Sequence, residues 1–114
     1  MSYVKPYVLE FEKPIRLYLH DVSGTRSFIS GNLIDAINPN LVRYDDDGDP
    51  YVKLHLDFLH KDTKDYHTYT FYFDVVETNG FDFVLSRNYL REYYLDSDTL
   101  GLPYGDVQVY QSQN

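Results

Sequence analysis

The sequence has no cysteine, no tryptophan and a single methionine among its 114 residues. Without cysteine, neither disulfide bonds nor a thiolate zinc site supplements the hydrophobic core. No apolar run reaches the roughly 20 residues that cross a bilayer, and residues 1–6 lack the apolar segment of a secretory signal. These absences predict an intracellular protein, cytoplasmic or nuclear, that makes no membrane contact. Its length predicts one domain, for which a partner subunit is needed to enclose a large active site.

Positive charge is also scarce, because the chain has 10 lysines and arginines and 18 aspartates and glutamates, which gives a net charge of −8. A field of this sign repels phosphate backbones, so nucleic acid is not an expected partner. Aromatic residues, in contrast, are abundant, with 13 tyrosines and 7 phenylalanines. Aromatic side chains pack well on pleated surfaces and are enriched at protein interfaces. The composition therefore predicts β structure and favours a protein or peptide partner.

Alternation of apolar and polar residues predicts strands along most of the chain. The first is expected at residues 7–11, with Tyr7, Leu9 and Phe11 on one face, followed by a turn at Lys13 and Pro14. The other expected strands cover residues 15–20, 27–30, 41–44, 51–58, 66–77, 81–86 and 107–110, with an acidic hairpin tip at 45–50 and a tight turn at 78–80. Helices are expected at residues 31–37 and 87–95, the second with Tyr89, Leu90, Tyr93 and Tyr94 on its apolar side.

The two halves of the chain follow the same order of elements. A strand, a turn after Asp21, a strand at 27–30 and a helix in the first half correspond to a strand, a turn at 79–80, a strand at 83–86 and a helix in the second. The sequence therefore predicts a duplicated strand–turn–strand–helix unit.

Residues 19–30 and 80–90 carry a family resemblance. The first block resembles an apolar strand that ends in Asp-Ser/Thr-Gly-Ala, and the second resembles a strand with an Ile-Leu-Gly segment before a helix. This order, over residues 7–111, is similar to that of the retropepsin family, the retroviral and LTR-retrotransposon aspartic proteases and their DNA-damage-inducible-type cellular relatives. The resemblance implies a mainly β, closed barrel or sandwich with one or two short helices. It makes residues 1–6 an N-terminal segment and residues 112–114 a polar tail.

In this family each subunit of a homodimer gives one aspartate to a dyad that shares a proton and activates water. The resemblance places Asp21 in this role, within the loop Asp21, Val22, Ser23, Gly24 and Thr25. Val22 has no hydroxyl to brace the loop, and Ser23 adds a Cβ where the family has glycine. Ser86 likewise replaces a glycine that packs behind the loop. Asp21 is either a catalytic carboxylate or a turn aspartate that bonds nearby backbone amides, and these departures favour the second.

Neither a metal ion nor another cofactor is expected. A calcium loop that began at Asp45 would need a bidentate carboxylate at about its twelfth position, which is occupied by Leu56. The histidines His55, His60 and His67 lack the spacing of helical metal ligands. A solvated hairpin tip is the expected role of the aspartates.

The sequence therefore favours a catalytically inactive retropepsin-like domain that serves in homodimerisation and protein–protein interaction. The expected interface is formed by the N-terminal and C-terminal strands of the domain. Its residues are Tyr7, Leu9, Phe11, Val107, Val109 and Tyr110. Two alternatives stay open. One is an active homodimeric aspartic endopeptidase that uses Asp21, and the other is a structural domain of a transposon- or virus-derived polyprotein.

Overall fold

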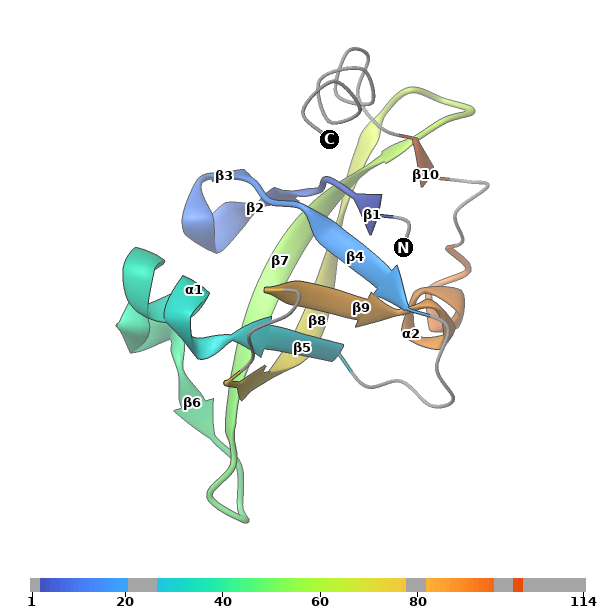
Figure 1. Ribbon diagram of the computed structural model, residues 1–114. Helices are drawn as coiled ribbons and strands as arrows, with labels where there is room; N and C mark the ends of the chain where they lie inside the picture. Colours follow the sequence, from blue (N-terminus) through green and yellow to red (C-terminus); the bar gives the residue numbers. More distant parts are fainter. Residues whose placement is uncertain (1–2, 21–26, 78–81, 96–99, 102–114) are drawn as a thin grey trace.

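The computed structural model describes residues 3–20, 27–77, 82–95 and 100–101, and its described part is built around one mixed β-sheet (Figure 1). The strands are β1 (Tyr3–Val4), β2 (Tyr7–Val8), β3 (Lys13–Pro14), β4 (Leu17–His20), β5 (Ser27–Ser30), β6 (Arg43–Tyr44), β7 (Pro50–His60), β8 (Tyr66–Val76), β9 (Phe83–Ser86) and β10 (Leu100–Gly101). The helices are α1 (Gly31–Ile37) and α2 (Arg87–Glu92), with short 3₁₀ turns η1 (Leu9–Phe11) and η2 (Pro39–Leu41). The mainly β class is confirmed.

The strand order is β1-β4-β9-β5-β8-β7-β2-β3, and β6 and β10 pair with further parts of β7. Because β1 and β3 end this order without pairing to each other, the described strands form an open sheet and not the expected closed barrel. Tyr3 and Val4 pair with Tyr18 and Leu17, so part of the expected N-terminal segment belongs to the sheet. Among the described helices, none has the length and apolar character needed to cross a membrane.

The long hairpin of β7 and β8 supplies much of the core. Alternate residues of β7, from Val52 to Phe58, are buried, and Phe71 and Phe73 of β8 are fully buried opposite them. Full burial of a side chain of this size contributes about 1.5–3 kcal/mol. The short strands β4, β9 and β5 lie across this hairpin, as Figure 1 shows. The strands predicted at residues 51–58 and 66–77 are therefore present as β7 and β8.

The expected duplication is present around the centre of the sheet. Strand β5 runs antiparallel to β9, while β4 pairs with β9 and β8 pairs with β5 in parallel. Each central strand ends in a buried serine, Ser30 or Ser86, whose hydroxyl accepts a hydrogen bond from the first turn of the following helix. In register, His20 lies opposite Ser86 and Val76 lies opposite Ser30. His20 and Val76 are therefore the equivalent residues of the two units.

The N-terminal region differs from the expected strand at 7–11. Strand β2 ends at Val8, η1 follows, and Glu12 has the positive φ of 56° that turns the chain back. Lys13 and Pro14 then form β3 instead of the turn. Val8 rather than Tyr7 faces the core, because Val8 pairs with the buried Leu56. Tertiary pairing with β7 therefore overrides the local alternation.

The second helix is shorter than expected. It ends at Glu92, and Tyr94 adopts a positive φ of 59° as the chain leaves it. Leu90 is fully buried, whereas Tyr94 is 94% exposed and does not belong to the apolar side to which the sequence pattern assigned it. The first helix, the β6–β7 hairpin and strand β8 lie where the sequence predicts them. The expected turn at 78–80 and strand at 107–110 lie outside the described residues.

Candidate functional site

The loop that the resemblance marks, with Asp21, Val22, Ser23, Gly24 and Thr25, lies outside the described residues. The strands that flank it are described. His20 ends β4 opposite Ser86, and Ser27 begins β5 opposite Leu85. The loop therefore connects two strands on opposite sides of β9.

A buried serine pair lies at this position. The Ser27 hydroxyl accepts a 3.3 Å hydrogen bond from the backbone N–H of Ser86, and the Ser86 hydroxyl accepts one of 3.2 Å from the N–H of Tyr89. Both serines are buried. The Ser86 side chain thus caps helix α2.

The predicted interface set divides into three parts. Val107, Val109 and Tyr110 lie outside the described residues. Tyr7 and Leu9 are 39% and 40% exposed, whereas Phe11 is only 7% exposed and packs in the core. Phe11 is buried because η1 folds it back onto the sheet. Tyr7 and Leu9 therefore remain available as surface residues, and Phe11 is a core residue.

The acidic tip of the β6–β7 hairpin is held by its own backbone. One carboxylate oxygen of Asp45 accepts hydrogen bonds from the N–H groups of Asp47, at 3.0 Å, and Asp49, at 2.8 Å. Gly48 takes the positive φ of 84° that this turn requires. Carboxylate oxygens of Asp45, Asp47 and Asp49 approach within 4.8 Å of one another, and all three residues are exposed. These contacts support the predicted role of a solvated turn.

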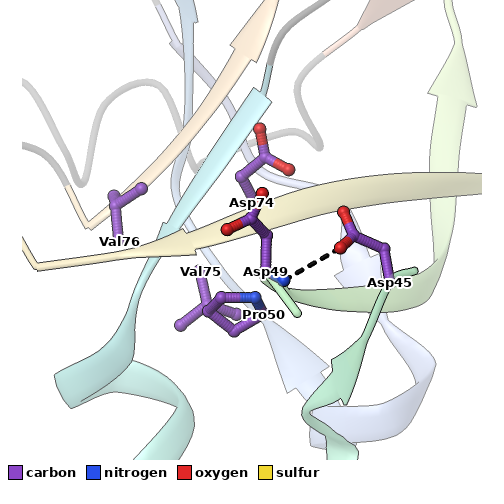
Figure 2. A pocket seen from close by; sticks show the side chains of 6 residues that line it. All are labelled: Asp45, Asp49, Pro50, Asp74, Val75 and Val76. Carbon is purple, nitrogen blue, oxygen red and sulfur yellow. Dashed lines mark hydrogen bonds between the residues drawn. The ribbon is translucent and has the colours of Figure 1, made fainter. Parts of the chain in front are cut away.

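A groove opens between this tip and strand β8 (Figure 2). Its volume is about 280 Å³, and it is lined by Asp45, Asp49, Pro50, Asp74, Val75 and Val76. In Figure 2 the three carboxylates gather on one side of the view, and the side chains of Pro50 and Val75 lie together below them. Asp74 is half-buried, as are Val75 and Val76. The groove thus has an acidic rim and an apolar wall.

Three tyrosines lie beside residues that line the groove. Tyr51 lies directly opposite Asp74, and its ring centre is 6.1 Å from that of Tyr72, which is 49% exposed. Tyr44 pairs with Pro50 across β6 and β7 and is 68% exposed. By register, Tyr51 and Tyr72 share a face of the sheet with Asp74, and Tyr44 lies on the other face with Pro50.

The histidines form separate contacts. His55 bonds to Glu10 through its backbone N–H, at 2.8 Å, and through its ring, at 2.5 Å. The rings of His60 and His67 meet edge to face with centres 4.6 Å apart, and His60 also bonds to the Tyr69 hydroxyl at 3.0 Å. In the described part of the chain, no histidine belongs to a group of three or more potential metal ligands.

The sequence pattern did not associate Asp74 with the acidic tip. Asp74 reaches Asp45 and Asp49 only through the register of β7 and β8, which pairs it with Tyr51. Alternation along β8 shows which face Asp74 takes, but the pairing register is a long-range property.

Neither a protein-family model nor a curated protein matches the sequence.

Proposed function

We propose that this chain is a catalytically inactive retropepsin-like domain that acts as a homodimerisation and protein-binding module. The arrangement of the two units supports the fold assignment. In each unit a strand, a loop, a short central strand and a capped helix follow one another, and the central strands β5 and β9 pair in the middle of the sheet. Both loops start from equivalent positions, after His20 and Val76.

The residues around the loop favour loss of catalysis. A carboxylate dyad needs hydrogen-bonding support to hold one shared proton between two close carboxylates. Val22 supplies no hydroxyl beside Asp21, and Ser23 replaces a glycine. Ser86, where the resemblance implies a glycine, carries a side chain that is engaged in capping α2. On this proposal the chain keeps the order of strands and helices, while the residues that catalysis requires are replaced.

The observation that carries the binding function is the exposed tyrosine face of strand β8. Tyr66 and Tyr72 are 53% and 49% exposed on one face of this strand, whose opposite face contributes Phe71 and Phe73 to the core. Tyrosines are enriched at protein interfaces because a rigid, amphipathic ring gives a large contact area at little entropic cost. A rigid sheet that presents such rings is suited to recognising another protein.

Sedimentation velocity at tens of micromolar tests homodimerisation, and the expected result is a dimer. A broad peptide library at acidic pH tests catalysis, and the expected result is no cleavage by the wild-type chain or by Asp21→Asn. Cleavage that disappears in Asp21→Asn would establish the endopeptidase instead. A monomeric chain that binds no protein or peptide would contradict the proposed role in homodimerisation and protein binding.

A further inference from the structure

We propose that the outer edge of strand β8, at residues 66–68, pairs with the same edge of a second copy of this chain. This inference rests on the proposed homodimerisation and names the surface through which it occurs. An unpaired strand edge presents a row of backbone donors and acceptors to which a further strand can bond. Figure 1 shows that β7 and β8 extend past the short central strands.

Helix α2 closes one part of this edge. The hydroxyl of Tyr89 accepts a 3.1 Å hydrogen bond from the backbone N–H of Tyr72. The hydroxyl of Tyr93 donates a hydrogen bond of 2.6 Å to the backbone carbonyl of Thr70. Further along the strand, β5 pairs with β8 at residues 74–76. From residue 70 to residue 76 the edge is therefore covered by α2 and β5.

Residues 66–68 form the open part of the edge. In an antiparallel ladder, every second residue bonds to the neighbouring strand, and the residues between them direct their N–H and C=O groups to the other side. The β7–β8 register is continuous, so Tyr66 and Thr68 point away from β7 as Tyr72 does. In the described part of the chain, no hydrogen bond reaches these outward groups, and residues 66–68 are exposed.

The composition of this segment favours pairing. Proteins protect strand edges with charged residues, proline or bulges. Residues 66–70 are tyrosines, threonines and a histidine, with no charged acid, lysine, glycine or proline among them. Tyrosine and threonine also favour extended structure. Two copies can therefore pair here without bringing like charges opposite each other, although each chain carries a net charge of −8.

A two-fold axis at His67 matches the outward groups of the two copies. It places Tyr66 opposite Thr68 of the partner subunit, so that each outward N–H of one copy meets a C=O of the other. An aromatic residue opposite a β-branched one is a favourable cross-strand pair. A longer incoming strand would meet α2 at Thr70, whereas this symmetric pairing needs only residues 66–68 of each copy. The occupant that fits is therefore a second copy of the chain.

Sedimentation velocity and amide hydrogen exchange of the full chain, measured over a range of concentrations, test this pairing. We expect a dimer, and we expect the amides of Tyr66 and Thr68 to become protected as it forms. The amide of Tyr72 is bonded to Tyr89 within the chain, so its protection should not depend on concentration.

Thr68→Pro removes an outward N–H and no bond to β7, which is a position where strands accept proline. We expect at least about tenfold weaker self-association, because each copy loses a hydrogen bond. Thr68→Val is the matched control, since it also loses the side-chain bond to Asp57 but keeps the N–H. It should dimerise at least about tenfold more tightly than Thr68→Pro.

A charge swap at His67 keeps every backbone group and tests the position of the axis. Because His67 faces itself across the axis, His67→Lys and His67→Glu should each weaken self-association by up to about fivefold. An equimolar mixture of the two variants should restore dimerisation. These variants keep the test decisive if Thr68→Pro does not fold.

Protection of the Tyr66 and Thr68 amides in a monomer would show that another segment of the same chain covers the edge, and would overturn the inference. A mixture of the His67 variants that dimerises no better than either alone would also overturn it. If a dimer leaves these amides exposed, or if a monomer binds another protein or peptide, this inference fails and the proposed protein-binding role stands. A monomer that binds no protein or peptide contradicts both.

Discussion

The hydroxyl of Ser27 accepts a hydrogen bond from the backbone N–H of Ser86, and this bond joins the two halves of the chain at the centre of the sheet. Ser27 begins the central strand of the first unit, and Ser86 ends that of the second. Ser86 also caps helix α2, as Ser30 caps α1. The equivalent serines therefore fix the helices of both units to the strands before them.

Replacing either cap should lower stability by a similar amount. Ser86→Ala removes the acceptor of the Tyr89 N–H, and Ser30→Ala removes that of the Asn32 N–H. Each is expected to cost about 1 kcal/mol of the free energy of unfolding. Urea denaturation of the two variants measures this. A Ser86→Ala variant as stable as the wild type would show that the cap does not contribute.

Phe71 should be among the most costly residues to truncate. It is fully buried, and its ring contacts those of Phe58, Tyr89 and Tyr93. Phe71→Ala is expected to lower the free energy of unfolding by about 3–5 kcal/mol, since it leaves a cavity among these rings. Tyr94→Ala, at an exposed aromatic residue that follows α2, should change the free energy of unfolding by less than about 0.5 kcal/mol. Comparable losses of stability in Phe71→Ala and Tyr94→Ala would contradict the placement of Phe71 in the core.

Glu10 should stabilise strand β7 through its carboxylate. It accepts hydrogen bonds from the backbone N–H and the ring of His55 and is largely buried. Glu10→Ala is expected to cost about 1.5–3 kcal/mol, because bonds to a charged acceptor are lost. Glu10→Gln keeps an acceptor and should cost less. Thermal unfolding ranks the variants, and equal losses would show that the charge has no part in the contact.

Tyr89 should make stability depend on alkaline pH. Burial raises the pKa of Tyr89 above its ordinary value of 10.0, although the hydrogen bond from the Tyr72 N–H opposes this. Above about pH 10 the unfolded chain loses a proton that the folded chain keeps, so stability falls as the pH rises toward the folded pKa. Tyr89→Phe should reduce this fall, measured by urea denaturation across the range.

Tyr66→Phe provides the matched control, because Tyr66 is exposed at the start of β8. At neutral pH it should change stability by less than about 0.5 kcal/mol. Tyr89→Phe should cost about 0.5–1.5 kcal/mol there, since the Tyr72 N–H loses its acceptor. An unchanged pH dependence in Tyr89→Phe would contradict the role of its burial.

Local patterns predicted the elements whose signals lie within a few residues. Helix α1 follows from its apolar residues at 33, 34, 36 and 37 and the stop at Asn38 and Pro39, and β8 follows from alternation. The error at residues 9–11 has a tertiary cause, since Glu12 turns the chain so that Phe11 reaches the core. Tyr94 was misplaced because the helix ends before it.

The sequence by itself determined the mainly β class, the duplicated unit and the acidic hairpin, because the period of apolar residues and the turn residues are local properties of the chain. The tertiary structure alone decided that the sheet stays open over the described strands and that Ser27 meets Ser86. It also decided that Asp74 lines a groove with Asp45 and Asp49. These relationships depend on strand register between distant segments, which long-range packing selects and local sequence does not encode.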